Sequence, residues 1–405
     1  MQKKLIALAV AGAFVAPAAF AESGNVTIYG VMDASYDITD NGNSTTAQGE
    51  RTNKVSSNSS RIGFKGSEDL GNGLSAVWQL ETGINVDGTT DSNLNSRNTF
   101  VGLSGKTWGT VILGRHDTPY KLSTRSLDMF ADGLADNRNI MGGGSSTSLG
   151  SNKVANIAGT GTAATLNGSV ASFDGRQSNV VAYISPTMNG FTAAIAYVAG
   201  AESAATSGNK KGNAWSAMAN YSNGPWYGAL AYERHNFGTA GTGSLGPTVY
   251  LDKNGTTADI SDRSEHAWKL GVGYKANNFR VGFAYEKTSD DLGNVAALKC
   301  GSSDCLGHNA WNLGGGYTFG NNEVKVQYTK AGDMGSTANS GAKQWAIGLD
   351  HNFSKRTKIY AQYVKLSNDV NAQYGLNGAG ATGTVNAKGL DADPSAWSFG
   401  MRHSF

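Results

Sequence analysis

Short segments in which apolar and polar residues alternate strictly recur along the chain. Residues 268–275, 279–286 and 323–329 each place large apolar side chains at every second position, with polar or small ones between them. Because successive side chains of a β-strand point to opposite faces, each segment is predicted to form a strand with one apolar face. The C-terminal segment 395–405 follows the same rule. One of its faces carries Trp397, Phe399, Met401, His403 and Phe405.

The connections between these segments fall into two classes of length. Seven are short and turn-like, at residues 70–74, 107–109, 185–190, 222–226, 275–279, 319–323 and 353–357. Eight are longer polar stretches rich in Gly, Ser, Thr and Asn, centred near residues 47, 91, 146, 206, 250, 298, 337 and 380. Short turns at one end and long loops at the other, joining about sixteen strands, are typical of a transmembrane antiparallel β-barrel. A soluble β-sandwich, the alternative, gives no reason for this sorting of loops by length.

Composition agrees with an all-β chain that crosses a membrane with strands. The sequence has 55 glycines and only 6 prolines, which suits strands and tight turns. No segment approaches the roughly 18 consecutive apolar residues that a membrane-spanning helix requires. In lipid the barrel must be closed, because an open sheet edge would leave backbone N–H and C=O groups unpaired. We therefore expect the first strand, within residues 25–37, to pair with the terminal strand.

Residues 1–21 are predicted to be a secretory signal peptide, which leaves 22–405 as a single barrel domain. Lys3 and Lys4 precede an apolar run over Leu5–Val15, and small residues stand at the expected cleavage site. A buried N-terminal helix is the alternative. Removing residues 1–21 takes away two positive charges, so the formal net charge falls from +2 to about 0. No basic patch indicates nucleic-acid binding.

The mature chain resembles the general diffusion porins of Gram-negative bacteria, most closely those of β-proteobacteria. The residues that carry this resemblance are segments 25–36, 59–81, 96–103, 113–120 and 398–405. The resemblance implies a homotrimer of sixteen-stranded barrels, each with its third loop folded into the pore. It also implies passive diffusion of small hydrophilic solutes and ions, and contact with outer-membrane lipid and lipopolysaccharide. Phe405 would then belong to the signal that the outer-membrane barrel assembly machinery reads.

The third long connection, about residues 118–174, is far longer than the others and is expected to be the constriction loop. Apolar residues between 122 and 134 recur at roughly helical spacing, which predicts a short helix. Asp128 and Asp132 lie four residues apart and would share one face of this helix. A solvated helix face is the alternative for these two acids. The resemblance matches both to the acids on the loop side of the constriction, although Asp132 replaces a longer acidic side chain.

Basic residues are expected on the wall opposite this loop. In segment 61–65 the apolar side chains turn to lipid, which turns Arg61 and Lys65 inward. An outward Phe100 would likewise turn Arg97 inward.

A third arginine follows the variable loop. An outward Tyr183 turns Arg176 inward, and the resemblance matches Arg61, Arg97 and Arg176 to an arginine ladder of the family. Glu81 also faces the lumen, either as an arginine partner or in direct contact with permeating solutes. These residues predict a transverse field between wall arginines and loop acids across a gap of about 8 Å.

Other chemistries have little support in the sequence. The six histidines show no metal-ligand spacing, and no GxSxG nucleophile motif occurs. We therefore predict no cofactor, no metal and no enzymatic activity. The alternatives are a substrate-selective outer-membrane channel, a barrel adhesin or an outer-membrane hydrolase. Cys300 and Cys305 are predicted to close a small loop as a disulfide.

Overall fold

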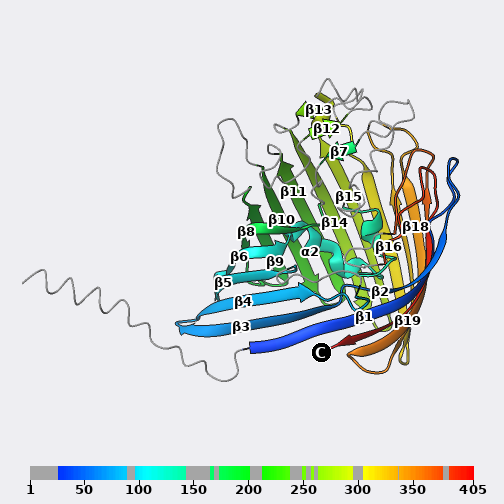
Figure 1. Cartoon of the computed structure of the whole chain (residues 1–405). Coiled ribbons are helices and arrows are strands. Elements are labelled where there is room, and N and C mark those ends of the chain that lie inside the picture. Colours follow the sequence, from blue (N-terminus) through cyan, green and yellow to red (C-terminus); the bar gives the residue numbers. More distant parts are fainter. Residues whose placement is uncertain are drawn as a thin grey trace, which may run out of the picture.

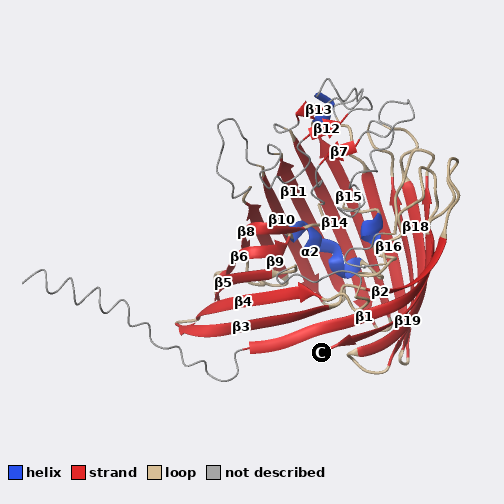
Figure 2. Cartoon of the chain, viewed as in Figure 1, coloured by secondary structure: helices blue, strands red, loops and turns tan. Residues whose placement is uncertain are grey.

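The computed structural model describes residues 26–88, 96–142, 165–167, 173–200, 212–237, 249–251, 257–259, 263–294, 304–335, 337–376 and 383–405. The predicted signal peptide lies outside these ranges. The described part is a closed antiparallel β-barrel with a few short helical turns inside the ring of strands (Figures 1 and 2). No helix in the described ranges is long and apolar enough to cross a membrane.

The elements follow one another in chain order. The wall strands are β1 (Val26–Asp40), β2 (Arg51–Ser57), β3 (Arg61–Gly71), β4 (Leu74–Gly83), β5 (Thr99–Gly105), β6 (Gly109–Asp117), β8 (Arg176–Ile184), β9 (Phe191–Val198), β10 (Asn213–Asn223), β11 (Trp226–Asn236), β14 (Ser264–Ala276), β15 (Phe279–Asp290), β16 (Asn309–Phe319), β17 (Asn322–Ala331), β18 (Ala342–Asn352), β19 (Thr357–Asn368) and β20 (Ser395–Ser404). The short elements are α2 (Pro119–Thr124), the 3₁₀ turns η1 (Arg125–Leu127), η2 (Asn137–Asn139) and η3 (Leu292–Asn294), and the strands β7 (Thr165–Asn167), β12 (Val249–Leu251) and β13 (Thr257–Asp259).

The barrel closes between its first and last strands, as predicted. β1 pairs with β20 from Val31↔Ser404 to Asp40↔Ser395. On its other side β1 pairs first with β3 and then with β2. These two are halves of one wall strand, interrupted near Ser59, which has φ 55°. Counted in this way, the wall has sixteen strands, and each pairs with its neighbours antiparallel.

The two faces of the wall are sorted opposite to those of a soluble protein. On β14 the outward Trp268 and Leu270 are 51% and 46% exposed, whereas the inward Lys269 is 1% exposed. An apolar outer face suits hydrocarbon, and a polar inner face suits water. The alternation predicted from the sequence is therefore confirmed, with the apolar side facing lipid.

The predicted sorting of connections by length is also observed. Seven tight turns join β3–β4, β5–β6, β8–β9, β10–β11, β14–β15, β16–β17 and β18–β19. The β3–β4 turn is built on Asn72 and Gly73, whose positive φ values of 53° and 76° suit a two-residue hairpin. Beyond the other rim, β12 pairs with both β13 and β7 in a small sheet (Figure 1). Since β7 belongs to the third long connection, this loop also contacts the fifth.

Candidate pore constriction

Loop 3, which we define as residues 118–175, begins with a helix that is shorter than predicted. Thr118 caps α2 by accepting the Lys121 N–H at 3.3 Å, and Pro119 occupies the first turn. The helix ends at Thr124, η1 follows, and Asp128 is extended, with φ −80° and ψ 121°. Asp132 has φ 75°. The prediction that Asp128 and Asp132 share a helical face is therefore wrong.

The helix ends because the loop must cross several wall strands. Neighbouring strands are about 4.8 Å apart, whereas a helix advances only about 1.5 Å per residue. Asp128 is extended, and between Leu127 and Phe130 the loop contacts three inward-facing glycines in turn. An added Cβ would lie 2.6 Å from Leu127 O at Gly282, 2.7 Å from Met129 Cγ at Gly314 and 2.8 Å from Phe130 Cε1 at Gly348. These glycines leave a groove in the wall for the loop.

Polar side chains of the wall fix the loop in this groove. Gln327 Oε1 accepts the Met129 N–H at 2.8 Å. Glu286 accepts the Tyr120 hydroxyl at 2.7 Å and the Gly142 N–H at 2.7 Å. Glu286 therefore bonds to two parts of the loop that are more than 20 residues apart in sequence.

The end of loop 3 is held by a second buried contact. Lys269 donates to Asp174 at 2.6 Å and lies 3.3 Å from Glu286. All three charged groups are nearly or fully buried. Buried charges are tolerated where they are paired, and this set ties the loop's return to the same wall strands as its start.

The predicted arginines form two groups on the wall. Arg97 donates to Glu81 Oε1, and Arg61 Nε lies 3.9 Å from the other carboxylate oxygen. Arg176 lies apart from them, 3.1 Å from Asp117 and donating to Asn98 at 2.7 Å.

Asp132 is where the loop meets the first arginine group. Its carboxylate lies 3.8 Å from Arg61, 4.0 Å from Arg402 and 2.6 Å from the loop's own Arg125. Burial favours the neutral acid, but Arg125, Arg138 and Arg61 together lower the pKa of Asp132 to about 2. The predicted gap of about 8 Å between loop acid and wall arginine is therefore wrong for this pair, since the charges are in contact.

Asp128 has a different environment from Asp132. Its side chain is buried and accepts the N–H groups of Phe130 at 2.9 Å and Asn137 at 3.1 Å. Burial and the neighbouring Asp136 raise the pKa of Asp128 above the usual range of an aspartate. Asp128 therefore holds the loop's own shape, and its carboxylate does not face the wall arginines.

Two loop arginines are part of this arrangement and were missed from the sequence. Arg125 bonds to Asp136 at 2.8 Å as well as to Asp132, and Arg138 bonds to Asp136 at 3.0 Å. The sequence signal is the spacing of acids at 128, 132 and 136 between arginines at 125 and 138. Acids four residues apart were interpreted as a helix face, whereas they surround a guanidinium.

The expectation that Phe100 faces lipid is wrong. Phe100 points inward and packs edge-on against His116, with ring centroids 5.4 Å apart, while Val101 and Leu103 face outward. The alternation holds within β5, but Phe100 belongs to the inward set of side chains and not to the lipid-facing set. Arg97 lies in the preceding bend, where its backbone N–H bonds to Glu81 O at 3.2 Å.

Lys65 lies four residues after Arg61 on β3. Its ammonium group sits 5.2 Å from the centroid of the Tyr29 ring. Among the residues that the structure describes, no ion pair joins Lys65 to loop 3.

A second set of lumenal charges, on β17–β20 and β1, was also missed. Lys325 and Lys358 bind Asp350 at 2.9 and 2.7 Å, and Arg402 binds Asp33 at 3.1 Å. Between these residues and loop residues 128–133 lies a cavity of about 300 Å³. The sequence signal was present, since Lys325 occupies an inward position of the alternating segment 323–329.

Two further predictions concern cysteine and metal. Cys305 carries a disulfide bond, but Cys300 lies outside the described residues, so their pairing stays a prediction. Within the described ranges, no group of three or more His, Cys, Asp or Glu side chains could hold a metal ion.

Comparison with known proteins gives consistent matches. A family model described as Gram-negative porin matches residues 7–372. Outer membrane porin protein 32 of Delftia acidovorans is 29% identical over 414 residues, and major outer membrane protein P.IB of Neisseria sicca is 27% identical over 415 residues, with 100% of both chains covered in each case. Major outer membrane protein P.IB of Neisseria gonorrhoeae is 38% identical over 136 residues, which is 33% of this chain and 37% of that protein. The solved anion-selective porin from Comamonas acidovorans has a TM-score of 0.70 at 25% identity, covering 94% of this chain and 99% of that one.

Proposed function

The chain belongs to the Gram-negative porin family, and from this premise we propose that it forms a water-filled channel in the outer membrane. Small hydrophilic solutes and ions diffuse through it down their gradients, without chemical change. The observation that carries the proposal is the sorting of the wall, which is apolar outside and charged inside, around a loop seated in the lumen. The full-length relatives that are outer-membrane proteins support the same location.

We further propose that the channel prefers anions. We call the part of the lumen where loop 3 meets Arg61 the narrowing. There the guanidinium groups are exposed to water, whereas most of their carboxylate partners are more deeply buried. The side chains of Arg61, Arg125 and Arg402 are 19%, 22% and 23% exposed, whereas those of Glu81 and Asp33 are 9% and 6% exposed. A permeating ion therefore passes closer to the fixed guanidinium groups than to the fixed carboxylates, which favours anions. The similarity to the anion-selective porin from Comamonas acidovorans supports this preference.

Assembly is proposed on the same basis. Membership of the porin family supports a homotrimer, a ring closed by point symmetry, and residues 1–21 are removed on export. Phe405 belongs to the signal read by the barrel assembly machinery. Its backbone exchanges hydrogen bonds with Gly30 at 3.0 and 3.1 Å, which places it at the seam of the barrel.

The experiment that tests the channel is a planar-bilayer recording with purified protein under a salt gradient. We expect stepwise conductance increases that scale with salt concentration and a reversal potential of the sign that anion preference requires. An absence of steps would contradict the channel itself. Steps with a reversal potential of the opposite sign would contradict only the anion preference.

A further inference from the structure

Two lumenal tyrosines lie on glycines of the neighbouring strand. Tyr29 of β1 is paired directly with Gly63 of β3, and Tyr360 of β19 is paired directly with Gly400 of β20. In both pairs a Cβ added to the glycine would overlap Cζ and the hydroxyl oxygen of the tyrosine. Each ring therefore lies flat across the next strand, in a space that only glycine leaves open.

Both hydroxyl groups donate to a carboxylate that is also bonded to a lumenal arginine. Tyr29 Oη donates to Glu81 Oε2 at 2.9 Å, and the other oxygen of Glu81 accepts from Arg97.

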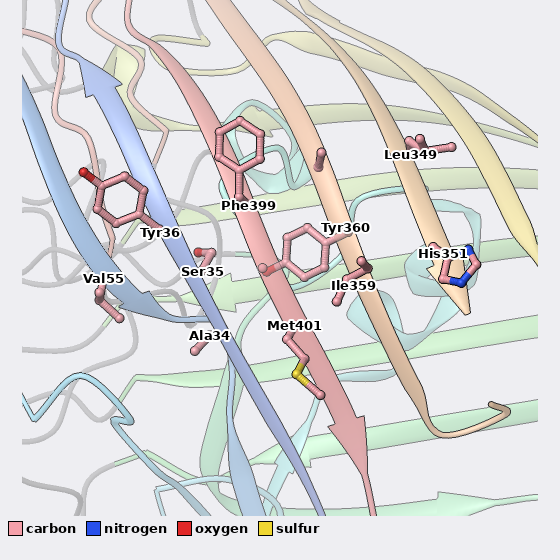
Figure 3. Close-up of a pocket in the computed structure, with 12 residues that line it drawn as sticks. Ala34, Ser35, Tyr36, Val55, Leu349, His351, Ile359, Tyr360, Phe399 and Met401 are labelled. Carbon is pink, nitrogen blue, oxygen red and sulfur yellow. The ribbon is translucent and has the colours of Figure 1, made fainter. Parts of the chain in front are cut away.

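The second tyrosine, Tyr360, makes the same chain of hydrogen bonds to a carboxylate and an arginine on the other side of β1. Tyr360 Oη donates to Asp33 Oδ1 at 2.8 Å, and Asp33 Oδ2 accepts from Arg402 at 3.1 Å. Asn58 Nδ2 donates to the Tyr360 hydroxyl at 2.9 Å. Figure 3 shows the Tyr360 ring extending from β19 across β20 toward Ser35 of β1.

We propose that Tyr29 and Tyr360 are positioning residues for permeation, which hold Glu81 and Asp33 and thereby fix the orientation of the arginines at the narrowing. The proposal rests on the channel function proposed above.

The reasoning follows from side-chain freedom. An arginine has many rotamers, and a surface carboxylate can turn with it, so an isolated ion pair does not set a single geometry. A tyrosine hydroxyl depends on only two side-chain torsions, and the glycine seat fixes both of them. The hydroxyl is thus a rigid donor that leaves one carboxylate oxygen, in a set direction, for Arg97 or Arg402.

The test replaces each tyrosine with phenylalanine, which keeps the ring on its glycine and removes only the hydroxyl. Loss of a hydrogen bond to a charged group changes the population of alternative orientations by about tenfold. In single-channel recordings we expect Tyr29→Phe and Tyr360→Phe to raise open-channel current noise severalfold and to move the reversal potential toward zero. The heat-resistant folded form should persist in both variants.

Tyr363→Phe is the matched control. Tyr363 lies on β19 three residues from Tyr360 and packs between Trp345 and Trp397, on the outward face. This variant should leave noise and reversal potential at the values of the parent.

A double-mutant cycle tests whether Tyr29 acts through Glu81. If it does, Tyr29→Phe has no further effect on noise in a Glu81→Gln background. Phenylalanine variants that conduct like the parent would overturn the inference while leaving the channel function intact. Variants that lose the heat-resistant form would overturn it as well, since the hydroxyl would then serve folding. A parent protein without channels would instead refute the proposed function.

Discussion

Replacing Asp132 with asparagine is expected to increase anion preference. Among the described residues of loop 3, Asp132 is the carboxylate at the contact with the wall whose side chain is partly exposed, at 21%, and its pKa of about 2 keeps it charged at neutral pH. An ion passing about 7 Å from this charge interacts with it by about 0.6 kcal/mol in bulk water, which is close to RT. Removing the charge therefore changes the anion-to-cation permeability ratio about sevenfold without salt. Screening over a Debye length of about 8 Å reduces this to roughly twofold.

The assay is the reversal potential of single channels under a potassium chloride gradient, measured for the parent, Asp132→Asn and Asp128→Asn. The last variant makes the same substitution four residues away, on a buried side chain that bonds to the loop backbone. We expect it to lower heat resistance but to move the reversal potential much less. An unchanged reversal potential in Asp132→Asn, or equal shifts in both variants, would refute the assignment of Asp132 to the narrowing.

Four further outcomes are expected. Replacing Arg61 and Arg97 with serine should move the reversal potential toward cations, and an unchanged value would place the narrowing elsewhere. Gly314→Ala should lower the thermal unfolding midpoint, because its Cβ would lie 2.7 Å from Met129 Cγ, whereas Gly315→Ala, whose nearest neighbour is Arg280 O at 3.7 Å, should not; equal midpoints would contradict the groove. Burial, together with Arg138 and Arg176, lowers the pKa of Lys121 to about 8, although Asp117 opposes this effect. Anion preference should therefore fall as the pH rises from about 7 to about 9, because the lysine loses its positive charge. A Lys121→Met channel with the same pH response would exclude this lysine as the cause. Deleting Phe405 should reduce the amount of heat-modifiable folded protein in the outer membrane more than deleting a loop residue, and equal amounts would argue against an assembly signal.

The barrel could be predicted from the sequence because alternation and loop length are local properties. Inward Lys325 and outward Val326 follow from a period of two, since every residue of a wall strand faces either lipid or lumen. The pairing of β1 with β20 followed from the cost of an open edge in hydrocarbon. Neither inference needed contacts between distant residues.

The constriction depended on such contacts, and there the predictions were less complete. Arg61 and Glu81 were identified because both lie in wall strands, where alternation fixes their side. Residues 127–130 of loop 3 follow the groove lined by Gly282, Gly314 and Gly348 rather than their own helical spacing. Because that groove belongs to other strands, the spacing within the loop could not reveal that the helix ends at Thr124 and that turns follow it.

Phe100 shows the same limit at smaller scale. Alternation shows that Phe100 points opposite to Val101 and Leu103, but its contact with His116 on the neighbouring strand decides that this face meets the lumen.

The central claim, a nonspecific water-filled pore, is tested most directly by the swelling of liposomes that contain the purified protein in sugars of graded size. The account predicts swelling rates that fall smoothly from pentose to trisaccharide and rise in proportion to concentration without saturation, because diffusion through an open lumen involves no binding step. No swelling with any sugar, or rates that saturate for a single sugar and exclude others of equal size, would contradict it.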